Sequence, residues 1–279
     1  MTLPASGTIR MDQVNTELGK AATAAITMND ANVRSLAGVP SGQYGMNSLW
    51  GKSAGPPPGQ VVFTGAATTW TVPAGVTSIS MVCVNASGSY SAAWDAEVRI
   101  GSSTGTLICR ASQTSGNFGD VGYTGGALGY SLDYGQGGAG GGGAAGYAGN
   151  GGNGGESFGN GAAAAAGSGG GGGGASKSGN GNNGGGVGLN GIGATGGASA
   201  GAGVPGSGGS GQFYGGGSGG PEGPSQNSLA GGSLCYKNNY AVSPGQVIWV
   251  RPNSVNGYPG GIRIMWGGGR SYPSNAGDM

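Results

Sequence analysis

Residues 69–84 read Thr-Trp-Thr-Val-Pro-Ala-Gly-Val-Thr-Ser-Ile-Ser-Met-Val-Cys-Val, two strand-like runs separated by a turn. Pro73-Ala74-Gly75 predicts the turn, because proline presets the backbone of its first central position. Side chains alternate between the two faces of a strand. In the second run, residues 77–84, one face carries Ile79, Met81 and Cys83 and the other carries Val82 and Val84. A strand that is apolar on both faces favours a central position, so we expect this run in the middle of a sheet.

Further strands rich in β-branched residues are predicted on both sides of a glycine-rich middle. They are Val61–Phe63, Thr69–Val72, Thr77–Val84, Glu97–Ile100 and Thr106–Cys109 before it, and Leu234–Tyr236, Gln246–Arg251 and Gly261–Trp266 after it. Ser243-Pro244-Gly245 is predicted to form a type II turn from its Pro-Gly order. We therefore expect a mainly β protein, in which residues 60–111 and 234–267 build one β-sandwich-like domain or small barrel.

The glycine-rich middle holds 52 of the 73 glycines, between Gly116 and Gly232. We place an inserted domain at residues 112–233, whose ends the flanking sheet would bring together. Its few apolar side chains cannot offset the backbone entropy lost on ordering so much glycine. It is therefore either a flexible linker or a polyglycine-II-like body, in which extended three-residue-per-turn helices bond through their main-chain amides. Stretches such as Gly137–Gly143 and Gly151–Gly155 favour the second outcome.

The first 53 residues contain a weak repeat at spacings of 17 and 18 residues. Its units are Ile9-Arg10-Met11-Asp12, Ile26-Thr27-Met28-Asn29 and Tyr44-Gly45-Met46-Asn47. Each unit ends in an Asp or Asn suited to cap a helix. Short helical patterns follow at Val14–Leu18 and Val33–Leu36, with Gly19 and Gly38 at the expected helix ends.

These patterns complete the predicted domain organisation. Residues 1–53 are expected to form a small α/β module that packs on something else, because it is too small to hold much core alone. Residues 54–59, Ala-Gly-Pro-Pro-Pro-Gly, predict a stiff linker. Residues 268–279 are expected to form a C-terminal tail.

Composition argues against several classes of function. The chain has 11 Lys+Arg and 10 Asp+Glu, and 8% of its residues are charged, which gives no electrostatic footprint for nucleic acid or an anionic membrane. No apolar run approaches the ~20 residues of a membrane-spanning helix, and we expect neither membrane insertion nor a signal peptide. The absence of histidine removes the commonest general base and neutral metal ligand. We expect no enzymatic activity, no metal and no cofactor.

Three groups of reactive residues have ordinary structural interpretations. Cys83 and Cys109 lie in apolar strand-like runs and are expected to be buried, and with Cys235 they are too few for a disulfide or zinc framework. Residues 45–53 resemble a phosphate-binding loop, but five residues separate the two glycines instead of four and no apolar strand precedes them. Asp95 and Glu97 share a strand face and are expected to be solvated charges on an edge, the alternative being a glycan-cleaving pair that would need a cleft.

Aromatic residues of the glycine-rich middle are the candidate receptor contacts, because tyrosine offers a stacking face and a polar group suited to sugars or protein loops. The candidates are Tyr123, Tyr130, Tyr134, Tyr147, Phe158, Phe213 and Tyr214. The alternative is that these rings pack laterally on the glycine lattice and fill its few gaps.

Several motifs resemble segments of tail proteins of tailed bacteriophages. Phe63–Ile79 resembles the Trp-x-Val-Pro-x-Gly-Val opening of their glycine-rich domains, and Ala241–Gln246 resembles the Val-x-Pro-Gly-x strand through which those domains return. Gly261–Asn275 is similar to endings of many phage structural proteins. Val33–Gly38 and Leu49–Ser53 look like a recurrent tail-protein module. The sequence departs from the pattern at Val84–Ser87, where more strand follows instead of glycines.

The resemblance implies a virion protein, made in the host cytoplasm, that acts as a tail-fibre or tail-tip adhesin. It would dock on other tail proteins through residues 1–53 and contact a bacterial surface receptor, either a glycan or an outer-membrane protein. A purely structural connector is the alternative, and a glycan-cleaving tail enzyme is a distant one. We also expect a homo-oligomer, because a glycine lattice leaves backbone groups at its rim that need partners; a trimer is expected by analogy with such fibres.

Overall fold

The computed structural model describes residues 3–88, 95–129, 139–156, 167, 183–191, 214, 229–255, 258–274 and 276–277. The chain divides into two compact units, Met1–Pro58 and Gly59–Met279. Its described elements, in chain order, are α1 (Met11–Glu17), α2 (Ala31–Ala37), the 3₁₀ helix η1 (Met46–Leu49), β1 (Gly59–Thr64), β2 (Thr68–Thr71), β3 (Ser78–Val84), β4 (Ala96–Ile100), β5 (Leu107–Ala111), β6 (Val121–Tyr123), β7 (Leu234–Ala241), β8 (Val247–Arg251), β9 (Ser254–Val255), β10 (Tyr258–Pro259) and β11 (Gly261–Trp266).

The first unit consists of short helices around a small apolar core. The buried members of this core are Leu3, Ile9, Val14, Val33, Leu36, Ala37 and Leu49. Helix α2 ends at Gly38, which adopts the left-handed conformation expected of a helix C-terminus (φ +74°). Gly19, which follows α1, also has a positive φ.

The predicted helix caps are wrong by one or two residues. The side chain of Asp30, not Asn29, caps α2, because it accepts the N–H of Asn32 at 2.9 Å, the bond that an N-cap makes. Helix α1 and η1 begin at Met11 and Met46, so Asp12 and Asn47 lie inside these helices rather than before them.

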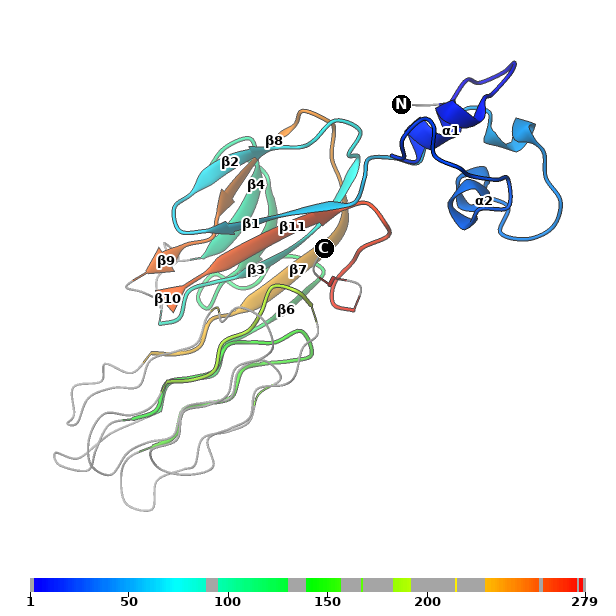
Figure 1. Cartoon of the computed structure of the whole chain (residues 1–279). Helices are drawn as coiled ribbons and strands as arrows, with labels where there is room; N and C mark the ends of the chain where they lie inside the picture. Colours follow the sequence, from blue (N-terminus) through cyan, green and yellow to red (C-terminus); the bar gives the residue numbers. More distant parts are fainter. Residues whose placement is uncertain are drawn as a thin grey trace. The chain divides into compact units, whose positions relative to one another are not determined.

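The second unit contains a β-sandwich, and the prediction of a mainly β fold is confirmed (Figure 1). One sheet has the order β1-β11-β3-β7-β6 and the other β2-β8-β4-β5, with antiparallel neighbours throughout. All eight predicted strands are present. Strand β3 lies at the centre of its sheet, as its two apolar faces predicted. Strands β6, β9 and β10 were not predicted.

Both predicted turns are present, and the second has the predicted arrangement. Gly245 has φ +81°, and the N–H of Gln246 donates to the carbonyl of Ser243 at 3.0 Å, which makes Ser243–Gln246 a type II turn. In the first turn Gly75 has φ +80°, and the N–H of Val76 donates to the carbonyl of Pro73. This turn therefore spans Pro73–Val76, and the prediction that proline occupies its first central position is wrong, because Ala74 is there.

The two faces of the five-stranded sheet contact different partners. Ile79, Met81 and Cys83 point into the core between the sheets, together with Ile248 and Val250 of the other sheet. The opposite face of β3 carries the next two side chains into a second apolar cluster, which packs against glycine-rich segments: Val82 and Val84. The alternation predicted for β3 is therefore confirmed.

The glycine-rich middle leaves and re-enters the sandwich at adjacent strands. It follows β6 and precedes β7, and Tyr123 is paired with Leu234 in the β6–β7 ladder. The sheet thus brings the two ends of the insertion together, as its closure requires. In Figure 1 the described green segments of the insertion run side by side next to β6 and β7.

Candidate functional site

The described glycine-rich segments hydrogen-bond to one another at every third residue. Segments 124–129, 139–146 and 149–156 are joined pairwise through their backbones. The bonds are Gly126 and Gly129 N–H to Gly143 and Gly140 C=O, Gly143 and Gly140 N–H to Gly152 and Gly155 C=O, and Gly151 and Gly154 N–H to Thr124 and Ala127 C=O, all of 2.8–3.0 Å. A three-residue repeat is the repeat of the polyproline II geometry.

Segment 139–146 also bonds to two other parts of the chain. The N–H groups of Gly142 and Ala145 donate to the carbonyls of Leu229 and Gly232, at 3.0 and 2.9 Å. Ala144 donates to Gly185 at 2.9 Å. Successive residues of this segment therefore donate in different directions, to residues 152–155, 229–232 and 185. Main-chain amides thus join segments that the sequence separates by up to about a hundred residues.

Glycine is required in these segments because the backbones approach closely. A Cβ at Gly126 would lie 1.9 Å from the carbonyl oxygen of Gly152, and one at Gly142 would lie 2.1 Å from that of Gly126. At Gly231 the distance to the Gly143 oxygen would be 1.8 Å. None of these three glycines has a φ in the left-handed region, so the missing side chain, and not an unusual φ, explains the residue type.

Tyrosines pack between the glycine-rich segments and the outer face of the five-stranded sheet. The rings of Tyr147 and Tyr272 stack at 5.8 Å with an interplanar angle of 3°, and both contact Tyr236 of β7. The hydroxyl of Tyr147 donates to the carbonyl of Gly188 at 3.0 Å, and that of Tyr272 to Leu189 at 3.2 Å. Buried tyrosines generally find such partners, and here the partners are backbone carbonyls of the insertion.

Two of the predicted receptor contacts are buried in this junction. Tyr147 is 6% exposed and Tyr214 is 3% exposed, and both belong to the cluster against the sheet. The prediction that these two residues contact a receptor is wrong, because their rings pack between the glycine-rich segments and the sheet. Tyr123 is partly buried at the edge of the same cluster. The remaining candidates lie outside the described residues: Tyr130, Tyr134, Phe158 and Phe213.

Arg263 of β11 is a fully buried charge that the sequence patterns did not indicate. Its guanidinium donates to the carbonyls of Leu189 (3.2 Å), Ala276 and Gly277 (2.8 Å), and to Oε1 of Gln60. A buried guanidinium needs such partners, since desolvation otherwise makes its burial very costly. Arg263 thereby joins the sheet to the insertion and to the C-terminal segment. Its place in an alternating strand gave no signal of this role.

Asp95 and Glu97 are not solvated charges on an edge, as predicted. Strand β4 lies between β8 and β5, and the two residues are 2% and 5% exposed. Glu97 is held by Arg99, with N–O distances of 3.0 and 3.1 Å, and by Nη2 of Arg251 at 3.1 Å. The arginines that flank Glu97 on its own and the neighbouring strand neutralise it, which explains its burial.

Asp95 has a less complete set of partners. Its Oδ2 lies 4.0 Å from Nε of Arg110, whereas Oδ1 is buried with no hydrogen-bond partner. Burial raises the pKa of the Asp95 carboxyl, and hydrogen bonds from Ser112 and the charge of Arg110 oppose this shift. This carboxyl therefore binds its proton more tightly in the folded chain than in the unfolded chain.

Replacing Asp95 with asparagine is expected to change how stability depends on pH. Because the pKa is raised on folding, the stability that Asp95 contributes is present at low pH and is lost as pH rises from about 4, the usual range of an aspartate. The difference in Tm between Asp95→Asn and wild type should therefore move in favour of the variant from pH 4 to pH 7. Calorimetry across this range tests the prediction, and a constant difference, or one that moves the other way, would refute it.

The three cysteines are fully buried free thiols in the core between the sheets, so the burial predicted for Cys83 and Cys109 is confirmed. Burial raises the pKa of the Cys83 and Cys109 thiols, which disfavours the reactive thiolate. In the part of the chain that the structure describes, no three side chains of His, Cys, Asp or Glu form a group that could hold a metal ion.

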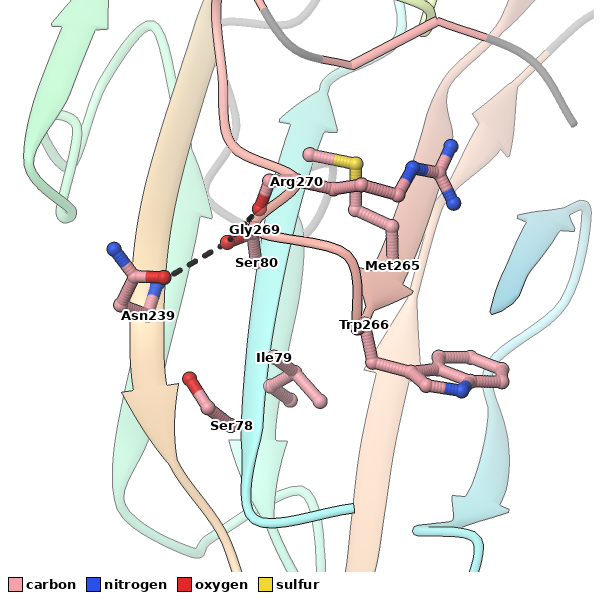
Figure 2. Close-up of a pocket in the computed structure, with 9 residues that line it drawn as sticks. Ser78, Ile79, Ser80, Asn239, Met265, Trp266, Gly269 and Arg270 are labelled. Carbon is pink, nitrogen blue, oxygen red and sulfur yellow. Dashed lines mark hydrogen bonds between the residues drawn. The ribbon is translucent and has the colours of Figure 1, made fainter. Parts of the chain in front are cut away.

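A small pocket lies between the start of β3, β7 and the turn after β11 (Figure 2). Its volume is about 160 Å³, the volume of about five water molecules. At its base the Ser80 hydroxyl accepts the N–H of Asn239 at 3.1 Å and donates to the carbonyl of Arg270 at 3.2 Å. Gly267, Gly268 and Gly269 all have positive φ, and the first and last of them line the pocket.

Comparison with protein-family models, with curated proteins and with solved structures finds no match. No described helix is long and apolar enough to cross a membrane. The function is therefore inferred from the contacts of the described residues and from the motifs of the sequence.

Proposed function

We propose that this chain is a structural and adhesive component of a bacteriophage tail, a fibre or tip protein whose glycine-rich body is held as a rigid platform. The observation that supports this function best is the three-residue repeat of backbone hydrogen bonds among segments 124–129, 139–146 and 149–156. We infer from it a polyglycine-II-like lattice, in which amide bonds provide the cohesion that apolar side chains provide elsewhere.

Such a body suits an adhesin because the bonds that hold the body together are distinct from the residues that would contact a receptor. Each described segment is fixed by bonds between main-chain groups, which require glycine only where the backbones approach closely. We infer that residues outside these contacts can vary in sequence without loss of the platform. Residues 1–53, which lie in the compact unit Met1–Pro58 and contain its apolar core, would dock on neighbouring tail proteins. Oligomers, expected to be trimers, would present several platforms.

A structural connector is the second candidate, and the burial of Tyr147 and Tyr214 favours it. These two rings hold the body on the sandwich and are not available to a receptor. In a connector the glycine-rich body would act as a spacer or a subunit interface, without contact to the host. Under the adhesin proposal, receptor binding would rest on the remaining candidates: Tyr123, which is partly buried, and Tyr130, Tyr134, Phe158 and Phe213, which lie outside the described residues.

Binding of the purified full-length chain to bacteria tests the adhesive function. Fluorescently labelled protein is expected to bind cells of a strain that the phage infects, to spare resistant mutants of that strain, and to reduce plaque formation when added first. Tyr130→Ala with Phe158→Ala should weaken binding, whereas Tyr147→Phe, which keeps the buried ring, should not. Failure to bind, together with a virion reconstruction that places the chain inside the tail, would establish the connector instead; a position in the capsid would overturn both.

A further inference from the structure

One rim of the glycine-rich body is bonded through side chains instead of a neighbouring backbone. The N–H of Thr124 donates to Oδ1 of Asn150 at 3.0 Å, and the N–H of Ala127 donates to Oδ1 of Asn153 at 2.9 Å. All four residues are exposed. On the inner side of the same segment, the N–H groups of the buried residues Gly126 and Gly129 donate to backbone carbonyls. The outer amides are thus satisfied differently from the inner ones.

The two asparagines occur in register with the lattice. Gly151 and Gly154 donate their N–H groups to the carbonyls of Thr124 and Ala127, the same two residues that the asparagines bind. Each Asn-Gly pair therefore satisfies both backbone groups of one residue on the neighbouring segment. The sequence of residues 150–155, Asn-Gly-Gly-Asn-Gly-Gly, repeats this arrangement after three residues. In a helix with three residues per turn, residues three apart lie on the same side.

We infer that Asn150 and Asn153 form a ladder that closes this rim against a further chain. Each carboxamide oxygen occupies the position where the carbonyl of an added glycine-rich segment would bond. An open row of amides would be a template for such a segment, and the nearest source is a second copy of this protein, as at an unprotected sheet edge. This rim is then excluded as the contact between copies, whatever the protein does in the virion.

The ladder is tested by removing the acceptor oxygens and by restoring them in another residue. In Asn150→Ala/Asn153→Ala, amide exchange followed by NMR should become about tenfold faster at Thr124 and Ala127, as expected for the loss of a hydrogen bond of ordinary strength. Exchange at Gly126 and Gly129 should change little, which shows that the body remains folded. Asn150→Asp/Asn153→Asp retains acceptor oxygens and should keep the protection.

Sedimentation of the same alanine variant tests the closure of the rim. It should show association that increases with concentration beyond that of wild type, whereas Asn32→Ala, at an exposed asparagine of α2, should not. Unchanged exchange at Thr124 and Ala127 would show that the asparagines do not protect these amides. Faster exchange with sedimentation identical to wild type would show that the rim does not attract a further chain. Either result overturns the inference.

Discussion

Gly126→Ala is expected to lower the free energy of unfolding of the second unit by about 3 kcal/mol, the upper range for forcing an extra methyl into a packed interior. The new Cβ would stand 1.9 Å from the carbonyl oxygen of Gly152, a backbone atom that no side-chain rotation can move. The segments would have to separate, and the bonds from Gly126 to Gly143 and from Gly231 to Gly126 would be strained or lost. Thermal or denaturant unfolding of the full chain measures the effect.

Gly277→Ala is the matched control for this prediction. A Cβ at Gly277 would meet no atom within 4 Å, and its φ is not in the left-handed region. The same chemical change should therefore alter stability by less than about 0.5 kcal/mol. If Gly126→Ala were as stable as Gly277→Ala, close backbone contact could not be the reason for glycine in these segments.

Arg263→Met is expected to destabilise the second unit by about 1–3 kcal/mol, the cost of leaving a buried carbonyl without a donor. Methionine fills much of the space of the arginine stem but donates no hydrogen bond. The carbonyl of Ala276 would lose its donor, whereas those of Leu189 and Gly277 would keep one donor each, from Tyr272 and Arg270. Because Leu189 belongs to the insertion, the loss should also loosen the glycine-rich body on the sheet.

Two further variants separate the role of Arg263 from that of charge in general. Arg263→Lys keeps the charge but not the planar fork of donors, so it should recover only part of the lost stability. Lys237→Met removes a cation from β7 that pairs with Asp120 and is 32% exposed, and such pairs contribute about 1 kcal/mol or less. If Arg263→Met and Lys237→Met lowered the unfolding midpoint equally, the contacts of Arg263 with the insertion and the C-terminal segment would not contribute to stability beyond an ordinary surface ion pair.

Local rules predicted the sandwich well because its strands obey them. Alternation of Ile79, Met81 and Cys83 with Val82 and Val84 assigned the two faces of β3, and Pro244-Gly245 assigned a turn type. Each of these features depends on neighbours in the chain. The three-residue spacing of the asparagines at positions 150 and 153 is a local feature of the same kind, and it matches the repeat of the hydrogen bonds that these residues make.

Long-range contacts explain what the sequence did not predict. Tyr147 and Tyr214 have the composition of binding residues, and only their place against the sheet shows that they are buried. Glu97 is neutralised in part by Arg251, which lies far along the chain on β8. Arg263 occupies a position in β11 where alternation gives no indication of contacts with the carbonyls of residues 189, 276 and 277. Tertiary partners of this kind cannot be derived from periodicity.

Amide exchange of the glycine-rich segments distinguishes a lattice held by main-chain bonds from a flexible tract. The amides of Gly126, Gly129, Gly140 and Gly143 all donate to backbone carbonyls at 2.8–2.9 Å. They should exchange at least a hundredfold more slowly than the same residues in an unstructured peptide, an order of magnitude set by bonds that open only with the surrounding structure. Exchange at the peptide rate would show that these bonds do not hold the segments together.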